Sequence, residues 1–207
     1  MNLPPFHGNC RCTIVVAEIQ TEPGLGSGAG DTDGNSVIIS DEPYDINDDK
    51  VIEKAFKKFL KDTADIDIEK AMIFSPNGIK YEIDGTEMNV NIGLIGEDAL
   101  KGAKVIHNHI KKYADSFSKE DFIAYFDYNL DSLEVAFRGK RHRIWWEGNK
   151  PNNFNPSRIY DSAFYEVSSE AFAEAIKGKV KKSISNYDVI KKLENTLKEK
   201  GLRLDEL

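Results

Sequence analysis

The sequence contains only two cysteines in 207 residues, Cys10 and Cys12, and they stand too close together for an easy disulfide. It also lacks any apolar run long enough to cross a bilayer. The N-terminus lacks the basic-then-apolar pattern of a signal peptide. These absences predict a soluble protein of a reducing compartment, with no membrane partner.

Basic residues are in deficit as well, because 28 lysines and arginines stand against 35 aspartates and glutamates, for a net charge of -7. No basic stripe is present that would offset phosphate repulsion, so nucleic acid is not an expected partner. With 40% of its residues hydrophobic, the chain has apolar material for one sizeable core plus appendages, but not for two full domains.

What the sequence does contain is a group of potential metal ligands. An apolar run ends in His107-Asn108-His109, and because side chains alternate along a strand, both histidines are expected on one face. Ser118 opens an amphipathic run, which predicts a helix N-cap at Ser118 and places Asp121 on the first turn. Two imidazoles and a carboxylate leave a fourth coordination position open, as in a catalytic zinc site. The plainer alternatives are a common His-x-His and an ordinary capping box.

This pattern of His-x-His, a short loop and Ser-x-x-Asp resembles the signature of the JAMM/MPN metalloproteases, and the central asparagine resembles their RadC-related bacterial branch. The resemblance implies that His107, His109 and Asp121 bind zinc and that Ser118 is the serine of the signature. Two features depart from the family pattern. The loop 110–117 is one residue longer than usual, and Ile110 stands where that branch generally has proline. Loops absorb single insertions readily, but the departures also fit a site that has lost activity.

The family also needs a glutamate on an earlier element, and Glu69 is the candidate. It precedes the apolar run 71–74 and the turn 75–78, a pattern that resembles the segment carrying the family glutamate. The competing interpretation is a solvated charge at the start of a strand. Glu82 and Glu87 are weaker candidates, because they fall in or after the second strand of this segment.

A mechanism is implied by the same resemblance. Zinc held by His107, His109 and Asp121 would lower the pKa of its bound water toward ~7. Glu69 would act as the general base, and Ser118 would stabilise the oxyanion. The implied reaction is hydrolysis of a peptide or isopeptide bond in a peptide or protein substrate. A zinc deaminase, whose layered fold is related, is disfavoured because no Pro-Cys-x-x-Cys follows the histidines.

A second resemblance concerns the first residues of the chain. The run Pro-Pro-x-His-x-x-Cys-Arg-Cys at 4–12 resembles the closing motif of phage head-morphogenesis minor capsid proteins. His7, Cys10 and Cys12 look like half of a structural metal site, a weak second partial site. The resemblance implies that the chain is the C-terminal part of a longer architecture, with phage portal or capsid proteins as partners. It also implies a location in the bacterial cytoplasm or the phage virion.

Composition and periodicity divide the chain into four parts. Residues 1–20 are expected to be the remnant of the head-morphogenesis domain, and 21–49, rich in Gly, Ser and Asp, a flexible linker. Residues 50–148 form the metal-site domain, and 149–207 a helical C-terminal extension. The order of elements predicts an α/β (α+β layered) fold. The motif implies a JAMM/MPN-like, cytidine-deaminase-like sheet flanked by helices.

His142 lies at a turn among arginines, and it is expected to be an exposed strand-end residue and not a ligand.

Two functions stay open on this basis. The first is a phage minor-head-associated, zinc-dependent peptidase or isopeptidase that uses a metal-activated water, and the retained glutamate, histidines, serine and aspartate favour it. The second is a catalytically silent structural or accessory module of a phage minor capsid protein, which the longer loop and the missing proline favour.

Overall fold

The structure is a computed structural model that describes residues 34–40, 44–110, 115–151, 153–177 and 184–207. His7, Cys10 and Cys12 lie outside the described residues, as do the whole expected remnant 1–20 and the first part of the expected linker. No helix in the described part of the chain is long and apolar enough to span a membrane.

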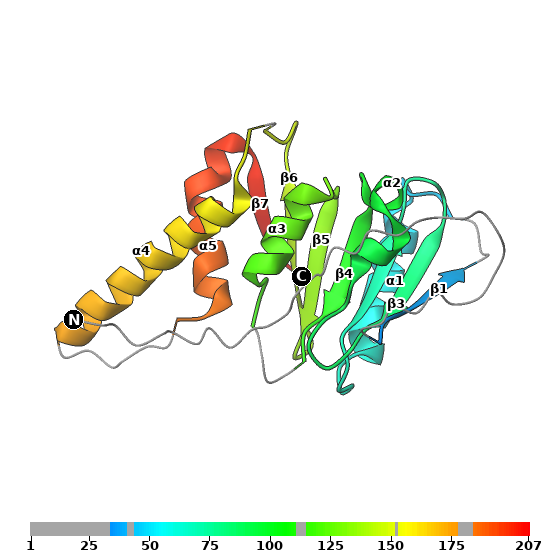
Figure 1. Ribbon diagram of the computed structural model, residues 1–207, viewed down its shortest axis with the longest axis horizontal. Coiled ribbons are helices and arrows are strands. Elements are labelled where there is room, and N and C mark those ends of the chain that lie inside the picture. The colour runs from blue at the N-terminus through cyan, green and yellow to red at the C-terminus, as the bar shows by residue number, and fades with distance from the viewer. Residues whose placement is uncertain (1–33, 41–43, 111–114, 152, 178–183) are drawn as a thin grey trace.

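One mixed sheet organises the molecule, and its strand order is β1-β3-β2-β4-β5-β6-β7 (Figure 1). The strands are β1 (Ser36–Ser40), β2 (Lys70–Phe74), β3 (Lys80–Asp84), β4 (Lys104–Asn108), β5 (Ser132–Phe137), β6 (Lys140–Trp146) and β7 (Leu202–Glu206). Among these strands β4 and β5 run parallel, and the other neighbouring pairs are antiparallel. The expected α/β layered class is confirmed.

Helices lie on both faces of the sheet (Figure 1). They are α1 (Asp49–Asp62), α2 (Glu97–Leu100), α3 (Lys119–Asp127), α4 (Pro156–Ile176) and α5 (Asn186–Leu197), with 3-10 turns η1 (Ile92–Ile95) and η2 (Lys198–Lys200). Helix α1 covers one face, and α3 covers the other together with α4, which packs against α3 and α5. The sheet is therefore the middle of three layers.

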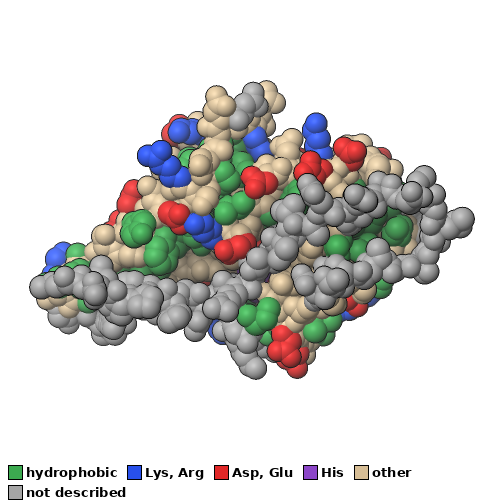
Figure 2. Space-filling model, in the orientation of Figure 1, with side chains coloured by type: hydrophobic (Ala, Val, Ile, Leu, Met, Phe, Trp, Pro, Cys, Tyr) green, Lys and Arg blue, Asp and Glu red, His purple; other side chains and the backbone are tan. Residues whose placement is uncertain are grey.

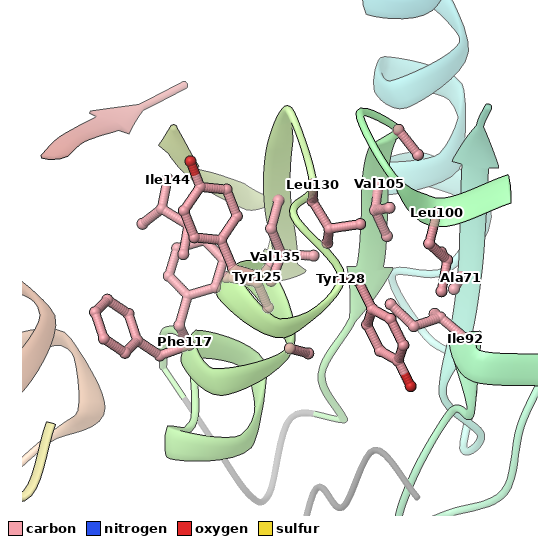
Figure 3. Packing of buried hydrophobic residues seen from close by; sticks show 14 of the residues in the cluster. Ala71, Ile92, Leu100, Val105, Phe117, Tyr125, Tyr128, Leu130, Val135 and Ile144 are labelled. Atoms are coloured by element: carbon pink, nitrogen blue, oxygen red, sulfur yellow. The ribbon is translucent and has the colours of Figure 1, made fainter. Parts of the chain in front are cut away.

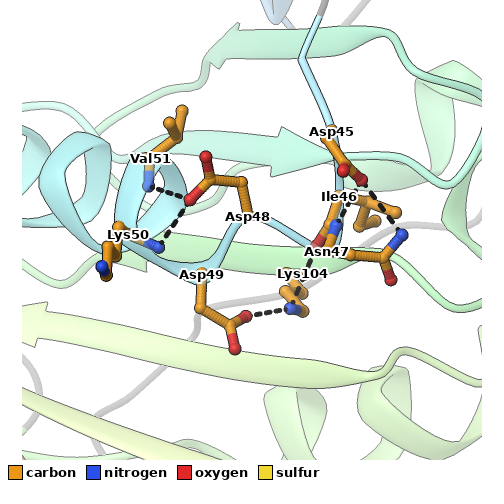
Figure 4. A network of polar contacts seen from close by, with 8 residues as sticks. All are labelled: Asp45, Ile46, Asn47, Asp48, Asp49, Lys50, Val51 and Lys104. Carbon is orange, nitrogen blue, oxygen red and sulfur yellow. Dashed lines mark hydrogen bonds and ion pairs between the residues drawn. The ribbon is translucent and has the colours of Figure 1, made fainter.

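Helix α1 shows how local sequence chemistry builds one of these layers. Asp48 caps it, because its carboxylate accepts hydrogen bonds from the backbone N–H groups of Lys50 and Val51 (Figure 4). Ile52, Phe56 and Phe59 follow helical spacing and are buried. They pack against β2, β4 and β5 side chains in a small core cluster.

The larger core cluster lies on the opposite face of the sheet. Figure 3 shows Tyr125 of α3 beside Val135 of β5 and Ile144 of β6, all of them buried. The cluster also includes apolar side chains of α5 and β7. This face therefore holds most of the apolar surface that stabilises the fold.

The structure differs from the expected boundaries at two strands. Strand β1 lies inside the range 21–49 that was expected to be linker, and it pairs with β3 along all five of its residues. Strand β7 lies inside the expected helical extension, where it pairs with β6 and buries Leu202 and Leu204. The segment after residue 148 is thus a part of the same sheet and core.

Helix α4 is buried along only part of its length. Tyr165, Phe172 and Ile176 are exposed, and Figure 2 shows hydrophobic side chains at the surface over this helix. The apolar stripe expected for this helix therefore packs into the core mainly in the N-terminal half of the helix, where Tyr160 and Ala163 are buried.

Candidate metal centre

Strand β4 carries His107 near the middle of the sheet, and His109 directly follows the end of this strand. His107 pairs with Ala71 of β2 on one side and with Val135 of β5 on the other. The backbone N–H of His109 donates to Ala136 O at 2.9 Å, which extends the contact with β5 past the end of the strand. The two imidazoles meet on one face, with their Nε2 atoms 3.0 Å apart.

Asp121 reaches the histidines from the first turn of α3. A capping box forms this helix start, because Ser118 Oγ accepts from Asp121 N at 3.0 Å and Asp121 Oδ2 accepts from Ser118 N at 2.7 Å. The capping interpretation and the ligand interpretation of Ser-x-x-Asp are therefore compatible. The cap also fixes the direction in which the carboxylate points.

The three side chains converge on one small volume. Asp121 Oδ1 lies 3.1 Å from His107 Nε2, and Oδ2 lies 3.2 Å from His109 Nε2. Ligands bound at 2.0–2.1 Å in a tetrahedron stand ~3.3 Å apart, so these separations fit one shared ion. All three residues are buried, and in the described part of the chain this group alone has its ligand atoms close enough to hold a metal ion.

The two histidines stabilise the ionised form of the Asp121 carboxyl. Burial raises the pKa of the Asp121 carboxyl, but the charges and hydrogen bonds of His107 and His109 outweigh burial and hold that pKa well below its usual range. Asp121 is therefore a carboxylate at neutral pH, which is the form that binds a metal ion.

Glu69 directly precedes β2, the strand that pairs with β4. Strand alternation assigns it to the face of Ala71, which pairs with His107. Its side chain is 1% exposed, so the interpretation of Glu69 as a solvated charge is wrong. Glu82 pairs with Met72 and so belongs to the other face, which removes it as a candidate.

Asn108 holds the Glu69 segment in place, a role that was not anticipated from the sequence. Its Oδ1 accepts from Lys70 N at 2.6 Å, and its Nδ2 donates to Ile68 O at 3.1 Å. The side chain thus clamps the backbone on both sides of Glu69. Strand alternation indicates only that Asn108 points away from the face of the two histidines. Its bonds to Lys70 and Ile68 become visible in the structure.

Ser118 lies at the edge of the group and is 1% exposed. Its oxygen accepts from Asp121 N, while its hydroxyl is one of the groups that lower the pKa of the adjacent Glu120 carboxyl. Burial is the larger influence and raises that pKa. The hydroxyl proton of Ser118 is thus directed to the Glu120 carboxyl.

His142 requires a correction, because it is buried and not exposed. Its Nδ1 lies 3.0 Å from Ser116 Oγ, and its ring packs against Phe137 and Tyr187. Burial lowers the pKa of the imidazole. His142 pairs with Val135, so its side chain lies on the same face of the sheet as His107. It is not one of the three candidate metal ligands His107, His109 and Asp121.

Comparison of the chain with protein-family models, with curated proteins and with solved structures finds no match. What the site can do therefore follows from its own side chains.

Proposed function

We propose that the protein is a zinc-dependent hydrolase of peptide or isopeptide bonds, of the JAMM/MPN type that the sequence resembles. The observation that carries the proposal is the convergence of His107, His109 and Asp121 within one buried group. Two imidazole nitrogens and one carboxylate oxygen are a donor set that zinc prefers, and three protein ligands are typical of catalytic zinc sites. Structural zinc sites normally use four.

Zinc bound there would lower the pKa of a water ligand to ~7 and polarise a substrate carbonyl. Glu69, buried just before β2, would take a proton from the attacking water and pass it to the leaving amine. Ser118 would donate its hydroxyl proton to the oxyanion that forms on the substrate carbonyl. The burial of the whole group strengthens each of these interactions, because little water competes for them.

The association with phage heads remains part of the proposal only through residues 4–12, which lie outside the described residues. The resemblance of residues 4–12 to a phage head protein suggests a capsid or host protein as the substrate. The alternative function is a silent accessory module of a minor capsid protein. Such a module would have the same fold but would catalyse no reaction.

The test measures metal content and turnover separately. Purified protein is expected to contain about one zinc per chain by mass spectrometry of metals, and His107→Ala and Asp121→Ala should lose it. His142→Gln is the matched control, since it alters another buried histidine on the same face and should keep the metal. Protein without zinc after loading and dialysis would contradict the proposal.

Turnover is measured on a fluorescent peptide library with the zinc-loaded protein. Glu69→Gln should keep the metal and reduce turnover by roughly 10²–10⁴-fold, the usual contribution of a general base. Glu82→Gln, on the opposite face, should change neither quantity. A Glu69→Gln protein with full turnover would exclude Glu69 as the base. Zinc binding without turnover on any peptide would favour the accessory module.

A further inference from the structure

Strand β1 forms one edge of the sheet, and no strand in the described part of the chain lies beyond it (Figure 1). The edge of a sheet presents backbone N–H and C=O groups to which another strand can bond. Natural edge strands are usually protected by charged side chains, by proline or by a bulge. Strand β1 has the sequence Ser-Val-Ile-Ile-Ser, without charge or proline, and it pairs with β3 residue for residue along its whole length. Its own residues therefore do nothing to block a further strand.

The hydrogen bonds around β3 show which backbone groups of β1 point outward. Gly85 N donates to Glu69 O at 2.8 Å, so the odd-numbered residues of the β3 segment turn their backbone groups toward β2. Successive residues of a strand turn these groups to opposite neighbours, so the even-numbered residues of β3 face β1. Even residues of β3 pair with even residues of β1. The backbone N–H and C=O groups of Val37 and Ile39 therefore point away from β3, at the outer edge of the sheet.

The side chains of β1 add apolar surface on both faces of this edge. Ile38 is 54% exposed and Ile39 is 59% exposed, and alternation places them on opposite faces of the sheet. Val37 lies on the face of Ile39, where it packs against the larger core cluster and is only partly buried. A strand added at this edge would bring side chains against those of β1 on both faces, which is the usual source of stability in a sheet.

The sequence of β1 is nearly the same in both directions, which makes this strand complementary to itself. Antiparallel pairing of two copies about Ile38 would place serine opposite serine at both ends and Val37 opposite Ile39. In this register the outward backbone groups of Val37 meet those of Ile39, so both pairs are hydrogen-bonded pairs. The two Ile38 side chains form the closer pair on the two-fold axis, where β-branched residues pack well and no charge is repelled.

We propose that the protein forms a two-fold symmetric dimer through β1, in which the sheets of two copies join into one continuous sheet. The partner is a second copy of this chain, and its β1 adds to the edge as an antiparallel strand. The two pairs of Val37 with Ile39 exchange about four backbone hydrogen bonds. The contact also covers Ile38 and Ile39, the two exposed isoleucines of the strand.

The dimer should be weak, because one pair of short strands buries less surface than a standard stable interface. A dissociation constant on the order of 10–100 µM is expected for a contact of this size. Sedimentation equilibrium of the full-length protein, from about 5 to 500 µM, should therefore show the mass rising from one chain toward two. Strands β3 and β2 separate this edge from β4, so the dimer does not depend on the proposed metal site.

The two-fold axis at Ile38 is tested by an exchange of charge. Ile38→Lys places two lysines opposite each other in the dimer, and Ile38→Glu places two glutamates opposite each other. Each variant alone should dimerise roughly tenfold more weakly than the wild type, because like charges directly opposite are destabilising and the isoleucine contact is lost. An equimolar mixture of the two variants should form a heterodimer, because lysine then faces glutamate.

Val51→Lys is the matched control, since it makes the same kind of change at an exposed apolar residue of α1, and it should dimerise like the wild type. Recovery of the dimer in the mixture separates the proposal from a loss of folding, because two misfolded variants would not restore each other. If Ile38→Lys dimerised as tightly as the wild type, or if the mixture stayed monomeric, the proposed register would be wrong.

Ile39→Pro tests the backbone bonds at the edge. Proline lacks the N–H group, and at this position that group points away from β3, so the pairing of β1 with β3 should survive while the dimer is lost. Ile39→Thr keeps both the N–H group and the branched side chain, and it should retain most of the dimerisation. A wild-type protein that stays monomeric at about 500 µM would overturn the proposal and leave the edge to another partner.

Discussion

Lys150 follows the β5–β6 hairpin and has an unusual environment for a lysine. Its Nζ atom donates to the backbone oxygens of Tyr125 and Leu130 and lies 3.6 Å from the centre of the Tyr125 ring. It therefore adds a donor to Tyr125 O, which also accepts from Leu130 N at 3.2 Å, and binds the Leu130 carbonyl just beyond α3. Burial lowers the pKa of its amine to about 7, although Asp131 acts in the opposite direction. The neutral amine has two N–H groups, which match the two carbonyls.

The stability of the protein should depend on pH through Lys150. Its pKa in the unfolded chain is about 10.4, so between pH 7 and 10 the unfolded state binds more protons and stability rises with pH. The stabilisation from this group is complete above the unfolded pKa and is lost as the pH falls through about 7. The free energy of unfolding of the wild type, relative to Lys150→Met, should therefore increase from pH 7 to 9.5 in urea titrations.

Lys54→Met is the matched control for this experiment, because Lys54 is exposed on α1 and stays hydrated in both states. Its difference from the wild type should stay level over the same pH range. If the difference in unfolding free energy between the wild type and Lys150→Met also stayed constant with pH, the Lys150 amine would be charged in the folded protein.

His142 illustrates what single residues reveal in the sequence and what they conceal. Its neighbours Arg141 and Arg143 suggested an exposed turn, yet both arginines point to the α1 face, where they meet Glu53 and Asp205. Strand alternation alone assigns His142 to the face of Ile144. The error came from giving local charge more weight than the period of two.

Gly85, at the end of β3, shows how an element positions the candidate base. Its N–H donates to Glu69 O at 2.8 Å, and a Cβ there would lie 2.2 Å from Asn89 O and 2.9 Å from Glu69 O. Gly85→Ala must therefore displace the surrounding backbone, first at Asn89 and then at Glu69. We expect a loss of roughly 1–3 kcal/mol in the free energy of unfolding, the usual cost of overpacking. Chemical denaturation measures it.

Gly78→Ala provides the comparison. Gly78 has φ of +82°, and nothing lies within 4 Å of its Cβ position, so only the backbone strain of about 1–2 kcal/mol applies. Gly85→Ala should in addition reduce peptide turnover, whereas Gly78→Ala should not. Equal turnover in both variants would show that Glu69 tolerates movement of its backbone.

The central elements were predictable from the sequence, and the two edge strands were not. Strands β2 to β6 carry long apolar or alternating runs and are bounded by recognisable turns. Strand β1 is short and lies beside a stretch rich in Gly, Ser and Asp, and β7 is the charged segment Leu202–Glu206. Both depend on pairing with β3 and β6, which lie far away in sequence. In β7 the buried Leu202 and Leu204 do alternate with Arg203 and Asp205, a period of two that the helical expectation for this segment missed.

For the whole molecule, the segment after residue 148 is expected to be indispensable. It contributes to the core cluster Val189, Ile190, Leu193, Leu197, Leu202 and Leu204, all of them buried. At about 1.5–3 kcal/mol for each side chain, their loss removes on the order of 10 kcal/mol, which is comparable to the stability of a typical domain. A chain ending at residue 148 should therefore lack a cooperative thermal transition by circular dichroism. A sharp thermal transition would instead show that the chain up to residue 148 folds on its own, as the domain boundary expected from the sequence predicts.

At the same scale, the three candidate metal ligands were accessible from the sequence and the environment of Glu134 was not. His107, His109 and Asp121 stand in two short runs separated by one loop, so strand alternation and the helix N-cap indicated that they meet. In the sequence Glu134 is an ordinary glutamate in a strand. Only the three-dimensional arrangement shows that it is buried beside Arg141.

Strand β4 is the fourth of seven and has hydrogen-bonded neighbours on both sides. A strand so enclosed cannot fray at its edges, and amides of this kind exchange with solvent only when most of the structure opens. His107 on this strand and His109, whose N–H donates to Ala136 O of β5, therefore take their spacing from the sheet. An ion bound between them would meet imidazoles that the backbone already holds in place.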